Sequence, residues 1–262
     1  MNEGATIRST LLAQLGALGV RTGDCLLVHA SYRAIRPIVG GPHGVIEALR
    51  EAIGVGGTLV MPSMTGGEQV YDAATSPTRK MGVIAESFWR QPAVRRGDHP
   101  TSTFAAWGRW SAFIAAPQAW TPAHGPDSPV GRVCAVDGKV LLLGVGHDAN
   151  TTIHLAEALA EAPYMVDVPC LVREGQRIVR RTYAEHDHCT QRFALVGQRL
   201  RARNLQREGP FGHGAAILAR SADVVAVARE ILAAGITAFL HDEGGGCAEC
   251  DEAWAALRAR PA

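Results

Sequence analysis

The pattern of apolar and polar residues along the chain predicts strands that alternate with helices. Three short apolar runs, at 24–31, 57–62 and 140–143, have the length and composition of strands that are buried on both faces. Between the first two runs, apolar residues recur at helical spacing over 45–53. Strand, helix and strand in this order form a βαβ-like unit, so the pattern predicts an α/β fold.

The remaining pattern supplies the elements around this unit. Helices are predicted over 6–18, 83–90, 190–203 and 222–234, and strands over 103–108, 214–220 and 236–241. Residues 169–183 alternate around Glu174 and Gly175, which is typical of a β-hairpin. We therefore expect a single domain over residues 1–262, with a central mixed, largely parallel sheet flanked by helices, a β-hairpin and a C-terminal extension.

The composition of the chain argues against several classes of protein, including nucleic-acid-binding and membrane proteins. The 262 residues are 47% hydrophobic and carry a formal net charge of +1, and the arginines are scattered. This balance argues against nucleic acid or an anionic membrane as a partner. The first residues have neither the basic start nor the apolar core of a signal peptide, and we see no membrane-spanning run. The six cysteines do not form a disulfide framework in a chain of this length, so reduced thiols in the cytoplasm are expected.

Candidate catalytic residues follow the apolar run at 140–143. A glycine-rich turn leads to Asn150 and Thr151, which are suited to cap a helix. His154 and Glu157 are three residues apart in that helix and share one face. A histidine oriented by a carboxylate above the end of a buried strand predicts a general base. From spacing alone, an ordinary exposed pair of side chains is the alternative interpretation.

A candidate ligand loop follows the first strand. It contains His29, Ser31, Arg33 and Arg36, and it precedes a pair of glycines at 40 and 41. Glycines allow a ligand to approach the backbone closely, and arginines can hold a phosphate. The glycine pair is equally consistent with a simple turn before a helix. The chain contains no Walker A motif, and the glycine spacing after the third strand does not fit a dinucleotide fingerprint.

The tail contains a possible metal site. Cys247 and Cys250 form a CxxC pair, which suits one edge of a tetrahedral zinc site. The candidates for the other two ligands are His186, His188, Cys189 and His241. We favour His188 and Cys189, which would give a structural zinc that clips the tail to the body. Reduced thiols without metal are the alternative.

Two other enzyme classes use residues of the same types. A zinc deaminase is excluded, because its H-x-E signature is absent at His154 and a glycine precedes Cys247. A serine hydrolase using Ser31 or Ser128 stays a minor alternative, since no G-x-S-x-G elbow is present. The acidic residues in or near loops, Asp72, Glu86, Glu157, Glu185 and Asp187, could together hold the amines of a polycation, although each alone is expected to be a solvated surface charge.

A series of motifs in the same order resembles the aminoglycoside 3-N-acetyltransferases. These motifs are LLVHASYRAIRPIVGGPHGVIEALREAIGVGGTLVMPS, HPTSTFAAWG, SPVGRV and LLLGVGHDANTTIHLAEALAEAPY. The segments EHDHCTQRFAL and HDEGGGCAECD are most similar to the type IV subgroup, which acts on apramycin, gentamicin and tobramycin. The likeness covers about residues 16–250. It implies a fold other than the common N-acetyltransferase (GNAT) fold, and no pyrophosphate loop of that fold is found.

The resemblance also implies a mechanism and a set of site residues. His154 would take a proton from the substrate's 3-amine, with Glu157 supporting the imidazole, and the amine would attack acetyl-CoA directly. Ser31 or a backbone N–H could stabilise the oxyanion, and Ala30 stands where relatives often carry serine. The implied coenzyme-binding residues are His29, Ala30, Ser31, Arg36, Ile38, Val39, Gly40 and Gly41, with Ser128 and Val130 closing over the pantetheine and Val145 lining the thioester. Asp72, Glu185 and Asp187 are chosen to hold substrate amines.

The implied partner is therefore an aminoglycoside antibiotic, and the protein would be a monomer or a homodimer that confers resistance. Two alternatives stay open. One is an acetyltransferase that acts on a different amine. The other is a zinc-stabilised protein that binds a small ligand without catalysis.

Overall fold

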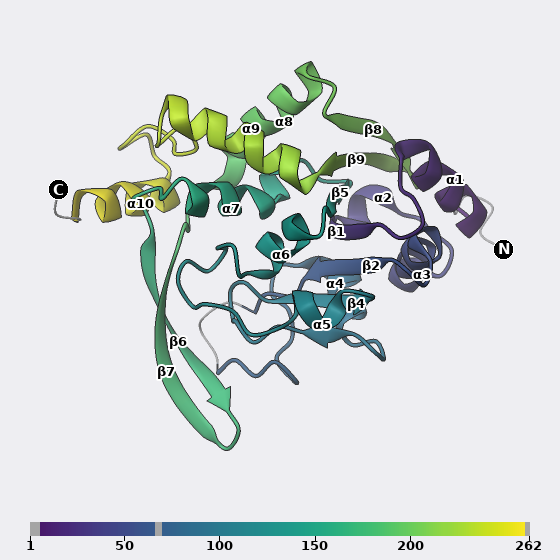
Figure 1. The fold of residues 1–262 in the computed structure, drawn as a ribbon, viewed down its shortest axis with the longest axis horizontal. Coiled ribbons are helices and arrows are strands. Elements are labelled where there is room, and N and C mark those ends of the chain that lie inside the picture. Colours follow the sequence, from purple (N-terminus) through teal and green to yellow (C-terminus); the bar gives the residue numbers. More distant parts are fainter. Residues whose placement is uncertain (1–5, 66–69, 260–262) are drawn as a thin grey trace.

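A mixed sheet of seven strands forms the centre of the molecule in the computed structural model, which describes residues 6–65 and 70–259. Figure 1 shows this sheet between two layers of helices. The strands in spatial order are β3 (Arg95–Arg96), β4 (Phe104–Gly108), β2 (Thr58–Pro62), β1 (Cys25–Ala30), β5 (Lys139–Leu143), β9 (Gly214–Arg220) and β8 (Gln206–Phe211).

The three apolar runs form the parallel centre of the sheet. β1 pairs in parallel with β2 on one side and with β5 on the other, with Leu27 opposite both Val60 and Val140. All other described pairs in this sheet are antiparallel. The mixed sheet is therefore confirmed, and its parallel part is confined to three strands. Their carboxyl ends lie at one edge, at the point where the strand order reverses, which is the usual ligand crevice of α/β folds.

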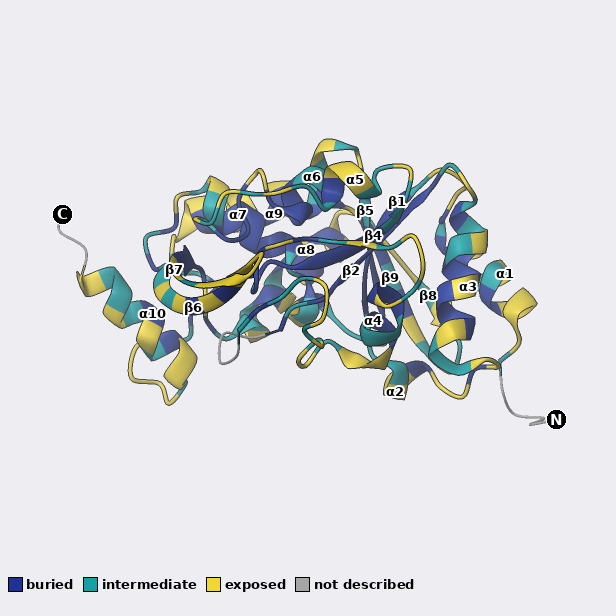
Figure 2. Ribbon diagram, turned by 90° about the horizontal axis from the view of Figure 1, so that it is seen from below, coloured by how far each residue is buried: buried dark blue, intermediate teal, exposed yellow. Residues whose placement is uncertain are grey.

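Helices cover both faces of the sheet. One layer contains α1 (Arg8–Leu18), α3 (Gly41–Ile53) and α4 (Gly82–Trp89), and the other contains α6 (Pro129–Ala135), α7 (Thr152–Leu159), α8 (Ala194–Ala202) and α9 (Ser221–Ala234). Successive residues of a strand point to opposite faces. Leu26 and Val28 of β1 accordingly pack in the first layer, and Cys25 and Leu27 in the second. Burial on both faces explains why this strand is an unbroken apolar run (Figure 2).

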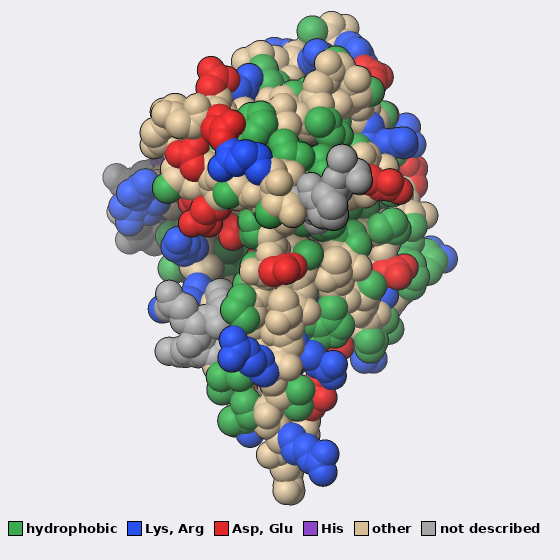
Figure 3. Space-filling model, turned by 90° about the vertical axis from the view of Figure 1, so that its left-hand side faces the viewer, with side chains coloured by type: hydrophobic (Ala, Val, Ile, Leu, Met, Phe, Trp, Pro, Cys, Tyr) green, Lys and Arg blue, Asp and Glu red, His purple; other side chains and the backbone are tan. Residues whose placement is uncertain are grey.

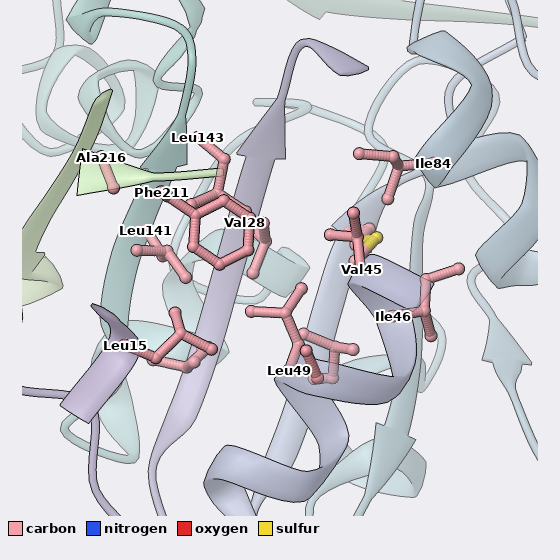
Figure 4. Packing of buried hydrophobic residues seen from close by; sticks show 14 of the residues in the cluster. Leu15, Val28, Val45, Ile46, Leu49, Ile84, Leu141, Leu143, Phe211 and Ala216 are labelled. Carbon is pink, nitrogen blue, oxygen red and sulfur yellow. The ribbon is translucent and has the colours of Figure 1, made fainter. Parts of the chain in front are cut away.

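Helix α3 shows how local sequence and packing agree. Gly40 precedes the helix with a φ of 78°, and Pro42 stands in its first turn, where its missing N–H costs no helical bond. Val45, Ile46 and Leu49 are fully buried and point towards the sheet (Figure 4). Each such side chain contributes about 1.5–3 kcal/mol through burial. The helix predicted over 45–53 is confirmed, and it begins four residues earlier.

The predicted β-hairpin is confirmed, and it directly follows the segment after α7. β6 (Val166–Glu174) and β7 (Arg177–Glu185) pair in register on both sides of Gly175, which turns with a φ of 62°. The hairpin projects from the body (Figure 1), and Figure 3 shows blue side chains along it. The exposed residues there include Arg173, Arg177 and Arg180. At its base, β7 leads directly into residues 186–189.

Several elements differ from the sequence pattern, including α2 (Tyr32–Ile35) within the expected ligand loop and the short strand β3. The strand predicted over 236–241 is wrong, because this segment is a turn closed by bonds from the Ala238 N–H to the Gly235 carbonyl and from the Leu240 N–H to the Thr237 carbonyl. β8 was not predicted, since Pro210 and charged residues obscure it; proline is tolerated because β8 lies at the sheet edge. The tail contains a further helix, α10 (Ala248–Ala259).

The other short elements are α2 (Tyr32–Ile35), α5 (Ser111–Ile114), η1 (His147–Ala149) and η2 (Thr190–Phe193). Among the helices in the described ranges, none is long and apolar enough to cross a membrane.

Candidate active site

Helix α7 carries the predicted base over the carboxyl end of β5. Gly144 turns the chain with a φ of 65°, and the Asn150 side-chain oxygen accepts a bond of 3.1 Å from the Thr152 N–H at the helix start. This bond satisfies one of the free N–H groups at the end of the helix, as the sequence pattern predicts. His154 and Glu157 then lie on one face of the helix.

A buried carboxylate joins two histidines. The Nδ1 atom of His154 lies 2.7 Å from Glu157 Oε2, and the Nε2 atom of His188 lies 2.7 Å from Glu157 Oε1. The Tyr164 hydroxyl donates a third bond of 2.7 Å to Oε1. Glu157 is completely buried, whereas the His154 side chain is 11% exposed. The arrangement orients the His154 ring and leaves its Nε2 atom as the accessible nitrogen, with no hydrogen-bond partner among the described residues.

The electrostatics of this group favour a charged pair beside His154. Burial alone would raise the pKa of Glu157, but the charge of His188 and the bonds from both histidines hold it far below its usual range. Burial would likewise lower the pKa of His188, yet Glu157 raises it. Both ring nitrogens of His188 have acceptors, because Nδ1 lies 3.0 Å from the Cys189 carbonyl oxygen. Two acceptors fit a protonated, doubly donating imidazole.

Two rings pack against His154. The ring of Phe193 meets it edge to face at 5.0 Å, and the ring of His124 lies at 5.2 Å with an interplanar angle of 30°. Burial and the neighbouring His154 hold the pKa of His124 well below its ordinary value, so this ring is neutral. Its Nε2 atom is buried and has no hydrogen-bond partner among the described residues. His124 therefore places a nitrogen atom without a described hydrogen-bond partner close to the His154 ring.

A pocket of about 650 Å³ opens at the carboxyl ends of the parallel strands. It is lined by His29, Ala30, Ser31, Tyr32, Arg33, Arg36, Pro62, Met64, Lys80, Met81, Gly82, Val83, Val145, Ala149 and Thr151. The cations Arg33, Arg36 and Lys80 are exposed there, and none has a carboxylate partner within the described ranges. Such a pocket suits an elongated ligand with anionic groups at one end. Thr151 lines it and precedes His154 by one helical turn, so the pocket ends beside the base.

His29 is a polar residue in the lining of this pocket. It is 5% exposed, and its Nε2 atom lies 3.3 Å from the Thr151 hydroxyl oxygen. Burial, with a smaller contribution from His147, lowers the pKa of His29 to about 4, so its ring is neutral at physiological pH. The Ser31 N–H donates to the Leu143 carbonyl oxygen at 2.9 Å, which leaves only the Ser31 hydroxyl free to meet a ligand.

Several predicted coenzyme residues lie outside this pocket. Ile38 is a core residue, and residues 39–41 lead into α3 away from the lining. The coenzyme roles expected for Ile38, Val39, Gly40 and Gly41 are therefore not supported by their positions. Ser128 is 1% exposed: its oxygen accepts a bond from the Gly131 N–H, as predicted for a helix cap, and donates to the Gly125 carbonyl at 2.6 Å. Val130 is fully buried in the core. In this structure Ser128 caps α6 and Val130 packs in the core, and their expected role in closing over the pantetheine stays a prediction.

The three predicted substrate acids are not all brought together. Glu185 and Asp187 lie at the end of β7, near the base site, and Asp187 is exposed. Asp72 instead lies beside the middle of the hairpin, 3.3 Å from Arg173. The bridge from Tyr71 to Val172 is six residues along β6 from the partner of Glu185, or about 20 Å. The placement of Asp72 with the substrate acids is therefore corrected.

The thiol cluster is assembled with a different histidine. Ligand atoms of Cys189, His241 and Cys247 lie within 4.8 Å of one another, and Cys250 Sγ is 3.5 Å from His241 Nδ1. His188 was predicted for this cluster, but its ring points to Glu157. His188 lies in a bend and its ring meets Glu157, whereas Cys189 contributes to the thiol cluster, so the two neighbouring side chains face different sites. His241 takes the position that His188 was expected to fill.

Sequence reasoning missed the residues that come from distant segments. His188, Tyr164 and His124 gave no local pattern with His154, and Lys80 gave none with the arginine loop. The only available signal was residue type: His and Tyr are common partners of a buried carboxylate.

Fold and site together define the class of this protein. The fold is α/β, and the site contains a histidine with one accessible nitrogen, ordered by a buried carboxylate and placed beside a cationic pocket, an arrangement with the chemistry of a general base next to an anion-binding pocket.

Comparison with known proteins identifies the family. The family model described as aminoglycoside 3-N-acetyltransferase matches residues 27–233. The aminoglycoside N(3)-acetyltransferase IV of Salmonella sp is 50% identical over 241 residues, which are 91% of this chain and 92% of that protein. Two crystal structures of the H154A mutant of aminoglycoside acetyltransferase AAC(3)-IVa, numbered as in that protein, are also similar. The complex with a gentamicin has a TM-score of 0.91 and 48% identity, covering 96% of this chain and 98% of that one.

The complex with apramycin has a TM-score of 0.86 and 47% identity, covering 94% of this chain and 98% of that one. This chain belongs to the aminoglycoside 3-N-acetyltransferase family of acyltransferases. Its fold is that of these enzymes and not the GNAT fold.

Proposed function

We propose that this enzyme transfers the acetyl group of acetyl-CoA to the 3-amino group of a 2-deoxystreptamine aminoglycoside, with His154 as the general base. The observation that carries the proposal is the Glu157–His154 pair, which leaves Nε2 of a buried imidazole accessible beside the pocket. Relatives that bind a gentamicin and apramycin support the substrate class.

The reaction proceeds by direct attack, without an acetyl-enzyme. The Nε2 atom of His154 takes a proton from the 3-ammonium or from the attacking amine, and the amine nitrogen forms a bond with the thioester carbonyl carbon. The carbon–sulfur bond then breaks, coenzyme A leaves as the thiol or thiolate, and the amide is formed. Glu157 stays ionised and stabilises the imidazolium that forms during the step.

Different residues of the pocket bind different parts of the coenzyme. Arg33, Arg36 and Lys80 hold its phosphates, because they are cations without carboxylate partners in the described ranges. Val145 and Thr151 lie at the end next to α7, where the thioester would reach His154. The backbone N–H of Ser31 already donates to the Leu143 carbonyl oxygen, so the Ser31 hydroxyl is the donor of this residue that would stabilise the oxyanion.

The aminoglycoside enters from the side of the hairpin base. Glu185 and Asp187 lie there, and carboxyl groups are the natural partners of its several ammonium groups. The substrate and the free thiols both fit a cytoplasmic enzyme.

A thiol-release assay with acetyl-CoA tests this proposal. The panel contains gentamicin, apramycin, tobramycin and kanamycin, and the product is mapped by NMR. The proposal predicts turnover and acetylation of the 3-amine. Coenzyme binding without turnover on any drug in the panel would contradict the substrate and favour another amine. Absence of coenzyme binding would contradict acyl transfer and favour the non-catalytic binding protein.

A further inference from the structure

Three soft donor groups, those of Cys189, His241 and Cys247, come together where the tail meets the segment after β7, and Cys250 lies beside His241. Cys189 comes from the segment after β7, His241 from the turn after α9, and Cys247 and Cys250 from the start of α10. The Cys247 side chain contacts those of Cys189 and Cys250, and Cys250 Sγ lies 3.5 Å from His241 Nδ1. All the cysteines are free thiols, so the cluster contains no disulfide.

The spacing of these groups is compatible with a tetrahedral metal site, and one donor-to-donor distance fits its edge closely. Zinc bonds of about 2.3 Å to sulfur and about 2.0–2.1 Å to nitrogen place sulfur and nitrogen ligands about 3.6 Å apart, and two sulfur ligands about 3.8 Å apart. The observed 3.5 Å between Cys250 Sγ and His241 Nδ1 matches the first of these edges. Three thiolates and one imidazole form a donor set that favours zinc over hard cations such as magnesium or calcium.

The backbone around the cluster also has the features of a metal knuckle. Gly244 and Gly246 have φ values of 69° and 86°, so the chain between His241 and the CxxC pair turns tightly. The His241 N–H donates to Cys250 Sγ at 3.4 Å, a bond that stabilises a thiolate, and the Asp251 N–H donates to the Cys247 carbonyl at 2.9 Å.

We propose that Cys189, His241, Cys247 and Cys250 bind one structural zinc ion. All four positions of the tetrahedron are filled by protein, so no site is left for a reactive water. The ion ties α10 to the chain segment next to α7, where Cys250 and Ala253 already pack against Ala162 and Tyr164 (Figure 1).

The zinc site is coupled to the base through one backbone group. The carbonyl oxygen of the ligand Cys189 accepts from His188 Nδ1, and His188 Nε2 meets Glu157, which orients His154. Fixing Cys189 thus fixes the outer end of this hydrogen-bond chain. His188 is a positioning residue in this account. The coupling rests on the proposed function, whereas zinc binding does not.

Metal content tests zinc binding without reference to activity. Protein purified without chelator is expected to contain about one zinc per chain by elemental analysis. The Cys247→Ser and Cys250→Ser variants should lose it, while Cys134→Ser, which alters a half-buried thiol outside the cluster, should keep it. Cobalt substitution of the wild-type protein should give the intense visible absorption of a tetrahedral thiolate site, which makes the test independent of how the variants fold. Wild-type protein without metal and without this absorption would overturn the proposal, as would a disulfide within the cluster.

The coupling has a separate readout. Zinc-free wild-type protein should bind coenzyme A with unchanged Kd, because the pocket is built by other elements, and should lose at least tenfold in kcat with gentamicin. Adding zinc should restore kcat. Full turnover by the zinc-free protein would overturn the coupling and leave zinc binding to stand on the metal analysis.

Discussion

At the scale of single residues, the candidate active site depends on a carboxylate removed from water. Glu157 is completely buried and accepts three hydrogen bonds, from His154, His188 and Tyr164. A buried charge is costly unless it is paired, and here the pairing also fixes the ring of His154, the proposed base. Stability and catalysis are therefore linked at this residue.

Replacing Glu157 should damage both properties. Glu157→Gln leaves His188 without a counter-charge in the core, so we expect a loss of about 3–5 kcal/mol in the free energy of unfolding, measured in urea. At temperatures where the variant is folded, kcat should fall on the order of 10²-fold or more, because His154 loses its orientation. Glu161→Gln, which changes an exposed carboxylate just after the same helix, is the control. Wild-type stability in Glu157→Gln would contradict the buried pair.

The cations of the pocket should affect the KM for acetyl-CoA but not the KM for acetyl-pantetheine. Arg33→Ala and Arg36→Ala are expected to raise KM for acetyl-CoA about tenfold each, since each loses a charge-assisted phosphate contact. KM for acetyl-pantetheine, which lacks the nucleotide phosphates, should hardly change. Arg177→Ala in the exposed hairpin is the control. Equal effects on both donors would argue against phosphate binding at these arginines.

Glu185 should make aminoglycoside binding depend on pH. Burial and the charge of Asp187, opposed by a bond with Tyr183, raise the pKa of Glu185 to about 8, so it is mostly neutral at pH 7. Ionising it in the folded protein is unfavourable, so its contribution to stability decreases as pH rises from about 4.5 towards 8. A bound ammonium group favours the ionised form. Affinity should therefore rise between pH 6 and pH 8, with release of a proton on binding.

Calorimetry in buffers of different ionisation enthalpy measures that proton. Protonation of the drug's amines contributes equally in the wild type and in Glu185→Gln, so the difference between the two proteins reports Glu185. Identical proton release in both would show that Glu185 does not meet the substrate.

At the scale of elements, a substitution at the start of α6 tests whether Ser128 stabilises the helix or binds the coenzyme. Ser128 accepts from the Gly131 N–H at the helix start and donates to the Gly125 carbonyl. Ser128→Ala should lower stability by about 0.5–2 kcal/mol, seen as a lower Tm. KM for acetyl-CoA should not change, because Ser128 lies outside the pocket. Ser221→Ala, which removes a buried hydroxyl without a partner among the described residues, is the control. A raised KM for acetyl-CoA would restore the contact with pantetheine that the family resemblance implied.

The elements also show what the sequence could predict. Strands β1, β2 and β5 were recognisable because burial on both faces leaves an unbroken apolar run. The His154–Glu157 pair was recognisable because one helix places both residues. The sequence pattern favours both His188 and Cys189 as metal ligands, but only Cys189 joins the thiol cluster, because sequence adjacency does not reveal that the two side chains point apart. The apolar 236–241 segment was misjudged because Phe239 and Leu240 are buried in two different clusters from within a turn.

At the scale of the whole molecule, the site lies where three parts meet. The parallel strands β2, β1 and β5 end at the cationic pocket, α7 presents His154 at its margin, and the hairpin base brings the acids and His188. The antiparallel strands outside the parallel centre extend the sheet without adding residues to the pocket lining. His154, the base that the resemblance to the acetyltransferases implies, therefore lies at the margin of the pocket, and several of the implied coenzyme residues lie outside its lining.

The role of His154 is the centre of this account, and one variant tests it most directly. Thiol release from acetyl-CoA with gentamicin should fall on the order of 10²–10⁴-fold in kcat in His154→Ala, while calorimetry shows unchanged coenzyme A binding. Near-wild-type turnover in a folded His154→Ala protein would contradict the mechanism.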